Sequence, residues 1–132
     1  KFTGELQRQE TLQNLATADM VIMPSLWEGR SILQLEAMSL DKPMMLSDVP
    51  ALREVFEEQS LKENELYRKC SWGYLVQTSN PESYRVAAEE FTKISDEEKK
   101  VMSQCVRQAS LQNDITVVAQ KYQQVYKKIL EK

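Results

Sequence analysis

The stretch "MVIMPSLWEGRSILQLEAMSLDKPMMLS", residues 20–47, carries the change of pattern that decides the fold. Residues 20–24 are a short apolar run that ends at a proline, which is typical of a strand buried on both faces of a parallel sheet. Ser31 then opens a predicted helix, which ends before Pro43. Residues 43–47 repeat the buried-strand pattern. The stretch therefore predicts strand, helix and strand in succession, the repeating unit of an α/β fold.

The rest of the chain extends this alternation and then becomes helical. Ser31 and Gln34 fit a capping box, in which the hydroxyl and the side-chain amide satisfy free backbone N–H groups. The other predicted elements are a helix over 5–18, a helix from Pro50, a strand over 73–77, and helices that begin near residues 81, 95 and 114. Residues 58–71 are charged and weakly patterned, and they are interpreted as a loop or a frayed helix end.

Three apolar stripes at helical spacing predict buried faces in the C-terminal third. The first comprises Tyr84, Ala87, Ala88, Phe91 and Ile94. The second comprises Val101, Met102, Cys105 and Ala109. The third comprises Ile115, Val118, Ala119, Tyr122, Val125, Tyr126 and Ile129, all of which are expected to face inward.

Composition limits the possible chemistry. The formal net charge is -3, which gives no general attraction to nucleic acid or to an anionic membrane. The sequence contains no histidine, so a Ser-His or Cys-His nucleophile pair and a histidine-ligated zinc are excluded. Cys70 and Cys105 are far apart and lack metal-ligand spacing, and they are interpreted as reduced structural thiols.

The loop that follows the first apolar strand is the leading candidate for a ligand site. In an open α/β sheet, ligands bind at the carboxyl ends of the strands. Gly29 allows a close backbone approach and a positive φ if one is needed, and the helix beginning at Ser31 directs free N–H groups to the same place. Glu28 and Glu36, with seven residues between them, can face one crevice and accept hydrogen bonds from hydroxyl groups. On spacing alone, a strand–loop–helix with two solvated acids is the simpler explanation of the pattern.

The order of these motifs adds a family resemblance. Residues 18–55, "ADMVIMPSLWEGRSILQLEAMSLDKPMMLSDVPALREV", resemble the donor-binding half of group 1 (family 4) retaining glycosyltransferases. The signature is an apolar strand ending in Pro-Ser, an aromatic-Glu-Gly, a second Glu after seven residues, and then "EAM" and "KP". The segments "WGYLVQTSNPESYRVAAEEF" and "YQQVYKKIL" are similar to later parts of the family, and residues 57–71 look like an insertion.

The resemblance implies a fold and a function. The expected fold class is α/β, with a Rossmann-like parallel sheet, flanking helices and a helical C-terminal third, as in the C-terminal domain of a GT-B type enzyme. Residues 1–132 would form a single, partial domain that binds a nucleotide-sugar donor. The parent enzyme would transfer the sugar with retention to a saccharide or lipid-linked acceptor, in polysaccharide or glycoconjugate biosynthesis.

Site roles follow residue by residue from the same resemblance. Glu28 is the catalytic candidate, contacting hydroxyls of the transferred sugar or assisting the reacting centre. Glu36 would accept hydrogen bonds from the nucleotide ribose. The backbone from Gly29 through Arg30, Ser31 and Ile32 would hold the diphosphate and the sugar. No cofactor and no metal are expected.

The chain departs from the family pattern in two places. Arg30-Ser31 stands where Phe-Gly or a similar small pair is common, which narrows the loop and adds a charge near the phosphates. Asp41 stands where glycine is usual, and an aspartate tolerates a left-handed cap at modest cost.

The start of the chain suggests a cut inside a larger protein. An acceptor domain and the first elements of the donor domain would precede Lys1, so the chain alone is expected not to transfer sugar. The strand in residues 20–24 would then present an uncovered edge and favour self-association. The expected location is cytoplasmic, with a parent enzyme that can be peripheral at the membrane. The alternatives are a non-catalytic α/β nucleotide-binding or interaction module and, less well matched in pattern, a nucleotide-sugar epimerase.

Overall fold

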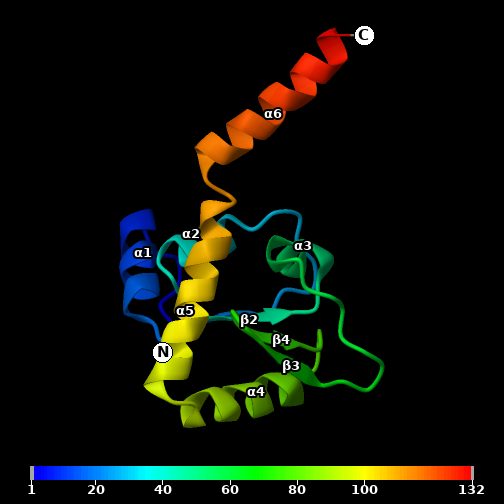
Figure 1. The fold of residues 1–132 in the computed structure, drawn as a ribbon. Helices are drawn as coiled ribbons and strands as arrows, with labels where there is room; N and C mark the ends of the chain where they lie inside the picture. The colour runs from blue at the N-terminus through cyan, green and yellow to red at the C-terminus, as the bar shows by residue number, and fades with distance from the viewer. Residues whose placement is uncertain (1, 132) are drawn as a thin grey trace.

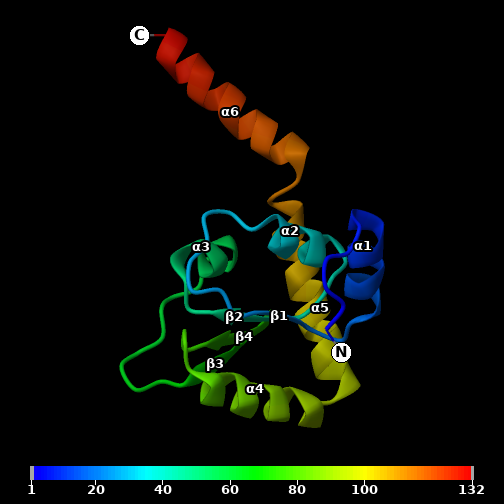
Figure 2. The ribbon, with the colours of Figure 1, turned by 180° about the vertical axis from the view of Figure 1, so that it is seen from behind.

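The protein is described here by a computed structural model that covers residues 2–131. Its helices are α1 (Arg8–Thr17), α2 (Ile32–Ser39), α3 (Pro50–Arg53), the 3-10 helix η1 (Glu54–Phe56), α4 (Pro81–Lys93), α5 (Asp96–Leu111) and α6 (Ile115–Leu130), and its strands are β1 (Val21–Met23), β2 (Met44–Ser47), β3 (Tyr67–Cys70) and β4 (Gly73–Val76). The sheet lies between α4 on one side and α1, α2 and α3 on the other, and α5 runs past it from the α4 side to the α2 side (Figures 1 and 2). Helix α6 projects away from this body in both views.

The four strands lie in the order β1-β2-β4-β3. Strands β1 and β2 pair in parallel, as do β2 and β4, and β3 is antiparallel to β4. The predicted α/β class with a mostly parallel sheet and flanking helices is confirmed.

Each face of the sheet carries its own apolar cluster. The cluster under α2, α3 and α5 contains Val21, Met23, Ala37, Met38, Met44, Leu46, Val49, Leu52, Trp72, Leu75 and Val106. The cluster under α4 contains Met45, Tyr74, Val76, Ala87, Phe91 and Met102, and the partly buried Tyr84, Ala88 and Ile94 pack against it. The first predicted stripe, on α4, therefore faces the core as expected.

Strand β1 differs from the prediction on one face. Val21 and Met23 are buried, but Ile22 between them is 49% exposed. Ile22 points to the same face of the sheet as Met45, its neighbour on β2, and α4 covers this face. Helix α4 contacts β3 and β4, at the other end of the strand order from β1, so it leaves Ile22 uncovered. The prediction of burial on both faces is wrong for this edge strand and right for β2, in which every residue is buried.

Strand β3 lies within residues 58–71, so the interpretation of that whole segment as a loop or frayed helix is wrong. Its side chains are only half-buried or exposed, and its sequence has no apolar alternation. Pairing with β4 holds it in place, with Cys70 opposite Gly73 across a two-residue connection. An edge strand with one neighbour needs little apolar surface, which explains its weak pattern.

Helix α6 is the largest departure. No residue of α6 is buried, and the exposed fractions of Ile115, Tyr122 and Ile129 are 76%, 60% and 64%. The prediction that its stripe faces inward is wrong. The period of a stripe determines which side of a helix is apolar, but it does not determine what lies opposite.

Helix α5 begins as predicted but turns a slightly different face inward. Ser95 caps it in a capping box with Glu98. Met102 is buried as expected, whereas Val101 is 47% exposed and Val106 is fully buried. The buried face of α5 is therefore rotated by part of a turn from the predicted face.

Candidate functional site

The start of α2 lies at the carboxyl end of β1, as the ligand-site argument requires. Ser31 is the N-cap, and its hydroxyl accepts a 3.3 Å hydrogen bond from the backbone N–H of Gln34. The first amides of a helix, here those of Ile32 and Leu33, have no acceptor within the helix and remain available to an anion. Ile32 itself is 68% exposed.

Only half of the predicted capping box forms. The buried Gln34 side chain does not return to Ser31, because its amide donates a 2.8 Å hydrogen bond to the carbonyl oxygen of Leu52 at the end of α3. A buried side-chain amide needs a partner, and α3 offers one. Gln34 thus joins α2 to α3 behind the candidate site.

Glu28 is half-buried, and Ser25 orients its carboxylate. The hydroxyl of Ser25 donates to the Glu28 carboxylate over 3.1 Å. The hydroxyl of Ser47, fully buried at the end of β2, donates to the carbonyl oxygen of Ser25 over 2.6 Å and lies 3.2 Å from that of Met23. The loop that carries Glu28 is therefore fastened to the neighbouring strand.

Replacing Ser47 by alanine is expected to lower the free energy of unfolding by about 1–3 kcal/mol, because a buried carbonyl group loses its donor. Urea denaturation measures the change. Ser39→Ala is the matched control: the Ser39 hydroxyl also donates to a backbone carbonyl, that of Glu36, over 2.7 Å, but it is exposed. Equal stability of the two variants would show that Ser47 does not support the loop.

Glu36 lies in the second turn of α2 and is paired across to α1. Its carboxylate is 2.8 Å from the Arg8 guanidinium, and the two side chains are 17% and 76% exposed. Arg8 is largely exposed, and the Glu36 carboxylate keeps further lone pairs that can accept hydrogen bonds from a ligand. Because Glu28 and Glu36 contact different partners, the idea that both acids face one crevice stays a prediction.

Gly29 and Arg30 lie between the two acids and are exposed. Gly29 is not among the residues with positive φ, and an added Cβ there would meet only the Trp27 ring, at 3.9 Å. The guanidinium of Arg30 donates a 2.8 Å hydrogen bond to the side-chain oxygen of Asn113, at the joint between α5 and α6. Gly29 and Arg30 also line a cavity of about 380 Å³ beneath this joint.

The exposed tip of the loop is apolar. Leu26 is 72% exposed and Trp27 is 81% exposed. Pro24 and Leu26 also line a cavity of about 360 Å³ with Tyr84 at the same end of the sheet. The candidate site thus has an apolar border beside its acids and amides.

Asp48, which follows β2, is used within the fold. Its carboxylate accepts hydrogen bonds from the hydroxyl of Ser60 (2.6 Å) and the N–H of Leu61 (2.8 Å), and it lies 3.2 Å from the Arg53 guanidinium. These contacts join the end of β2 to residues 60 and 61 and to α3.

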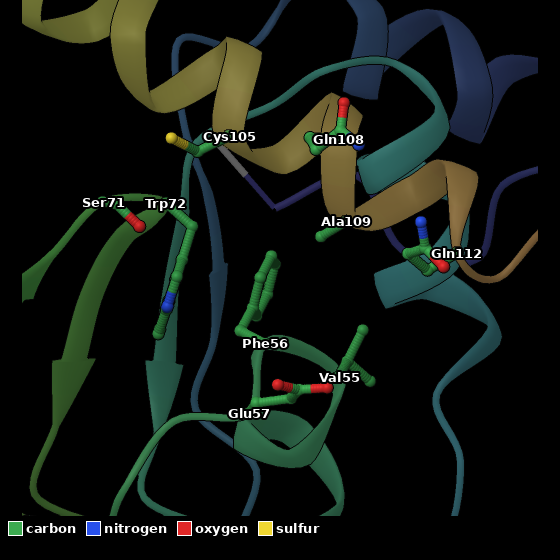
Figure 3. Close-up of a pocket in the computed structure, with 9 residues that line it drawn as sticks. All are labelled: Val55, Phe56, Glu57, Ser71, Trp72, Cys105, Gln108, Ala109 and Gln112. Atoms are coloured by element: carbon green, nitrogen blue, oxygen red, sulfur yellow. The ribbon is translucent and has the colours of Figure 1, made fainter.

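A further cavity, of about 430 Å³, lies between the η1 segment and the C-terminal half of α5 (Figure 3). Phe56 and Trp72 stack within it, with ring centroids 4.6 Å apart. Trp72 precedes β4, so this cavity is near the amino end of that strand, away from the edge where α/β proteins bind ligands. Its lining residues are Val55, Phe56, Glu57, Ser71, Trp72, Cys105, Gln108, Ala109 and Gln112.

The two cysteines are both free thiols. Burial, followed by the nearby Glu58, raises the pKa of Cys70 to about 12, which keeps this thiol protonated and unreactive at neutral pH. The structural interpretation of Cys70 fits this environment.

Sequence reasoning did not find several groups that shape the site. In the sequence, Ser25 stands out only as part of the Pro-Ser signature, and Ser47 only as the last residue of the second apolar run. Arg8 and Asn113 reach the loop and α2 from distant parts of the chain, and no local pattern marks them.

Across residues 2–131, none of the helices has the length and apolarity needed to cross a membrane.

A Rossmann-like α/β protein is the class that this fold defines. Comparison with known families is more specific: the family described as "Glycosyl transferases group 1" matches residues 1–93 of the 132. The chain belongs to the group 1 glycosyltransferases. No curated protein matched the chain. The matched region includes β1 to β4, the candidate loop and α4, whereas α5 and α6 follow it.

Proposed function

We propose that the chain binds a nucleoside-diphosphate sugar at the start of α2, as the donor module of a family 4 retaining glycosyltransferase. The whole enzyme would transfer the sugar to a saccharide or lipid-linked acceptor in polysaccharide or glycoconjugate biosynthesis, without a metal. It would act in the cytoplasm or at the membrane surface.

One observation carries the proposal: free amides at the start of α2 lie at the carboxyl end of a parallel strand, with Glu28 before them and Glu36 after them in the chain. The amides of Ile32 and Leu33 and the positive end of the helix suit a diphosphate. Glu28, oriented by Ser25, suits the hydroxyls of the transferred sugar. Glu36, one turn further into α2, suits the ribose hydroxyls. The family match supports the same assignment.

The test is calorimetric titration of the protein with UDP, GDP and ADP, and then with the corresponding nucleotide sugars. Binding of one nucleoside diphosphate, weakened when Glu36 is replaced, is expected. The alternative, a non-catalytic α/β module that kept the scaffold, predicts no binding of any of them.

The edge position of β1 leads to a second expectation, self-association of the chain. In the described residues β1 is at one end of the sheet order, and Ile22 on it is 49% exposed. Such an edge can pair with a second copy. Sedimentation velocity at increasing concentration is expected to show a dimer, and Ile22→Lys is expected to shift the population toward monomer. A clean monomer at the highest concentrations would contradict the proposal.

A further inference from the structure

The environment of Arg30 differs from that of every other arginine in the described chain. The sequence has six arginines. Five of them lie within 4.0 Å of a carboxylate, namely Arg8, Arg53, Arg68, Arg85 and Arg107. Among residues 2–131, Arg30 has no ion pair, and its guanidinium is instead held by the neutral side-chain oxygen of Asn113.

Asn113 is itself held in place. Its side-chain N–H donates a 3.1 Å hydrogen bond to the carbonyl oxygen of Ala109 in the last turn of α5, which orients the amide oxygen toward Arg30. Asn113 is half-buried, so its rotation is restricted, whereas Arg30 is exposed. A contact between residues 83 positions apart thus restrains a long, flexible side chain without neutralising its charge.

The cavity that Arg30 lines carries charged side chains of both signs. Lys121 of α6 lines it together with Arg30, and Glu54 and Glu57 line it as well. Arg30 directly precedes Ser31, the N-cap of α2, so its cation adds to the positive end of that helix. A guanidinium with four N–H donors besides the one given to Asn113 can still bind phosphate oxygens.

We propose that Asn113 is a positioning residue for the donor diphosphate, because it holds Arg30 beside the start of α2 while leaving its charge unpaired. The proposal rests on the proposed donor site and adds to it a residue from outside the region that matches the family. Arg30 makes the contact with the diphosphate, and Asn113 acts only through Arg30.

The test is calorimetric titration with inorganic pyrophosphate, the preferred nucleoside diphosphate, and the matching nucleoside. Arg30→Ala is expected to weaken the binding of pyrophosphate and of the nucleoside diphosphate about tenfold, because a charge-assisted hydrogen bond is lost. Binding of the nucleoside is expected to stay unchanged. Asn113→Ala is expected to weaken both diphosphates severalfold, with no further effect when Arg30 is already alanine. The control is Arg107→Ala, which removes a cation paired with Asp41 at 2.7 Å and is expected to leave the binding of all three ligands unchanged.

Asn113→Asp separates positioning from simple tethering. The aspartate carboxylate still accepts a hydrogen bond from Arg30, but it also neutralises the positive charge of Arg30. We therefore expect diphosphate binding to be weaker than in Asn113→Ala, although the contact is retained. A purely structural tether would be preserved or strengthened by this change. Binding by Asn113→Asp at or above the level of the unaltered protein, or effects of Arg30→Ala and Asn113→Ala that multiply, would overturn the proposal.

Failure of the donor site gives a different result. Pyrophosphate binding that depends on Arg30 and Asn113, without binding of any nucleoside diphosphate, would overturn the proposed function and support the positioning role. An unaltered protein that binds neither pyrophosphate nor a nucleoside diphosphate would overturn both.

Discussion

Gly73→Ala is expected to lower the free energy of unfolding by at least about 4 kcal/mol, within the exceptional tail of single substitutions. A Cβ at Gly73 would lie 1.9 Å from the carbonyl oxygen of Met44, and 2.8 Å and 2.9 Å from its backbone nitrogen and carbon. These are backbone atoms of the adjoining central strand, so no side chain can move aside. The φ of +144° adds strain for any L-residue.

Urea denaturation followed by circular dichroism measures this effect, or shows loss of the folded state altogether. Two other glycines are the controls. Gly29→Ala places its Cβ 3.9 Å from the nearest atom and is expected to change stability by no more than about 0.5 kcal/mol. Gly4→Ala has open space but a φ of +70°, so a loss of about 1 kcal/mol is expected. If Gly73→Ala were as stable as Gly29→Ala, the described pairing of β2 with β4 would be incorrect.

Glu36→Ala is expected to weaken nucleoside-diphosphate binding by about 10–100-fold, corresponding to about 1.5–3 kcal/mol for hydrogen bonds to a charged group. The fold should tolerate the change. The lost partner, Arg8, is 76% exposed, and pairs of this kind contribute about 0–1 kcal/mol. Calorimetric titration measures the loss of affinity.

Asp41→Asn is the matched control for Glu36→Ala. Asp41 also pairs with an arginine, Arg107, at 2.7 Å, but at the other end of α2. Its φ is +56°, the left-handed conformation predicted for this helix end, which asparagine also tolerates. Nucleotide affinity should be unchanged in Asp41→Asn, and an equal loss in both variants would remove the specific role of Glu36.

The sequence predicted those elements whose patterns arise from burial within the body. Strand β2 is covered on both faces and reads as an unbroken apolar run, and the stripe on α4 meets the sheet directly. Strand β3 was missed because its single partner, β4, holds it through backbone pairing that leaves little trace in side-chain polarity. The apolar stripe of α6 was recognised, but its exposure depends on where the α5–α6 joint directs the helix, which no local pattern records.

The same distinction applies to the candidate site. The position of Ser31 as N-cap follows from local chemistry and was predicted. The contacts of Arg8 with Glu36 and of Asn113 with Arg30 join segments that only the tertiary fold brings together. Whether the predicted donor residues bind a nucleotide sugar depends on the ligand, and the titrations above address it.

The exposure of α6 has a consequence for how the protein unfolds. Its hydrogen bonds are supported by its own cap at Asp114 and by Lys127 and Lys128 in its last turn, and not by tertiary packing. An isolated helix of 16 residues is marginally stable in water. The backbone amides of α6 should therefore exchange with solvent deuterium far sooner than those of β2 and β4. On heating, helical signal should decline gradually before the cooperative transition of the body, so unfolding would depart from two-state behaviour.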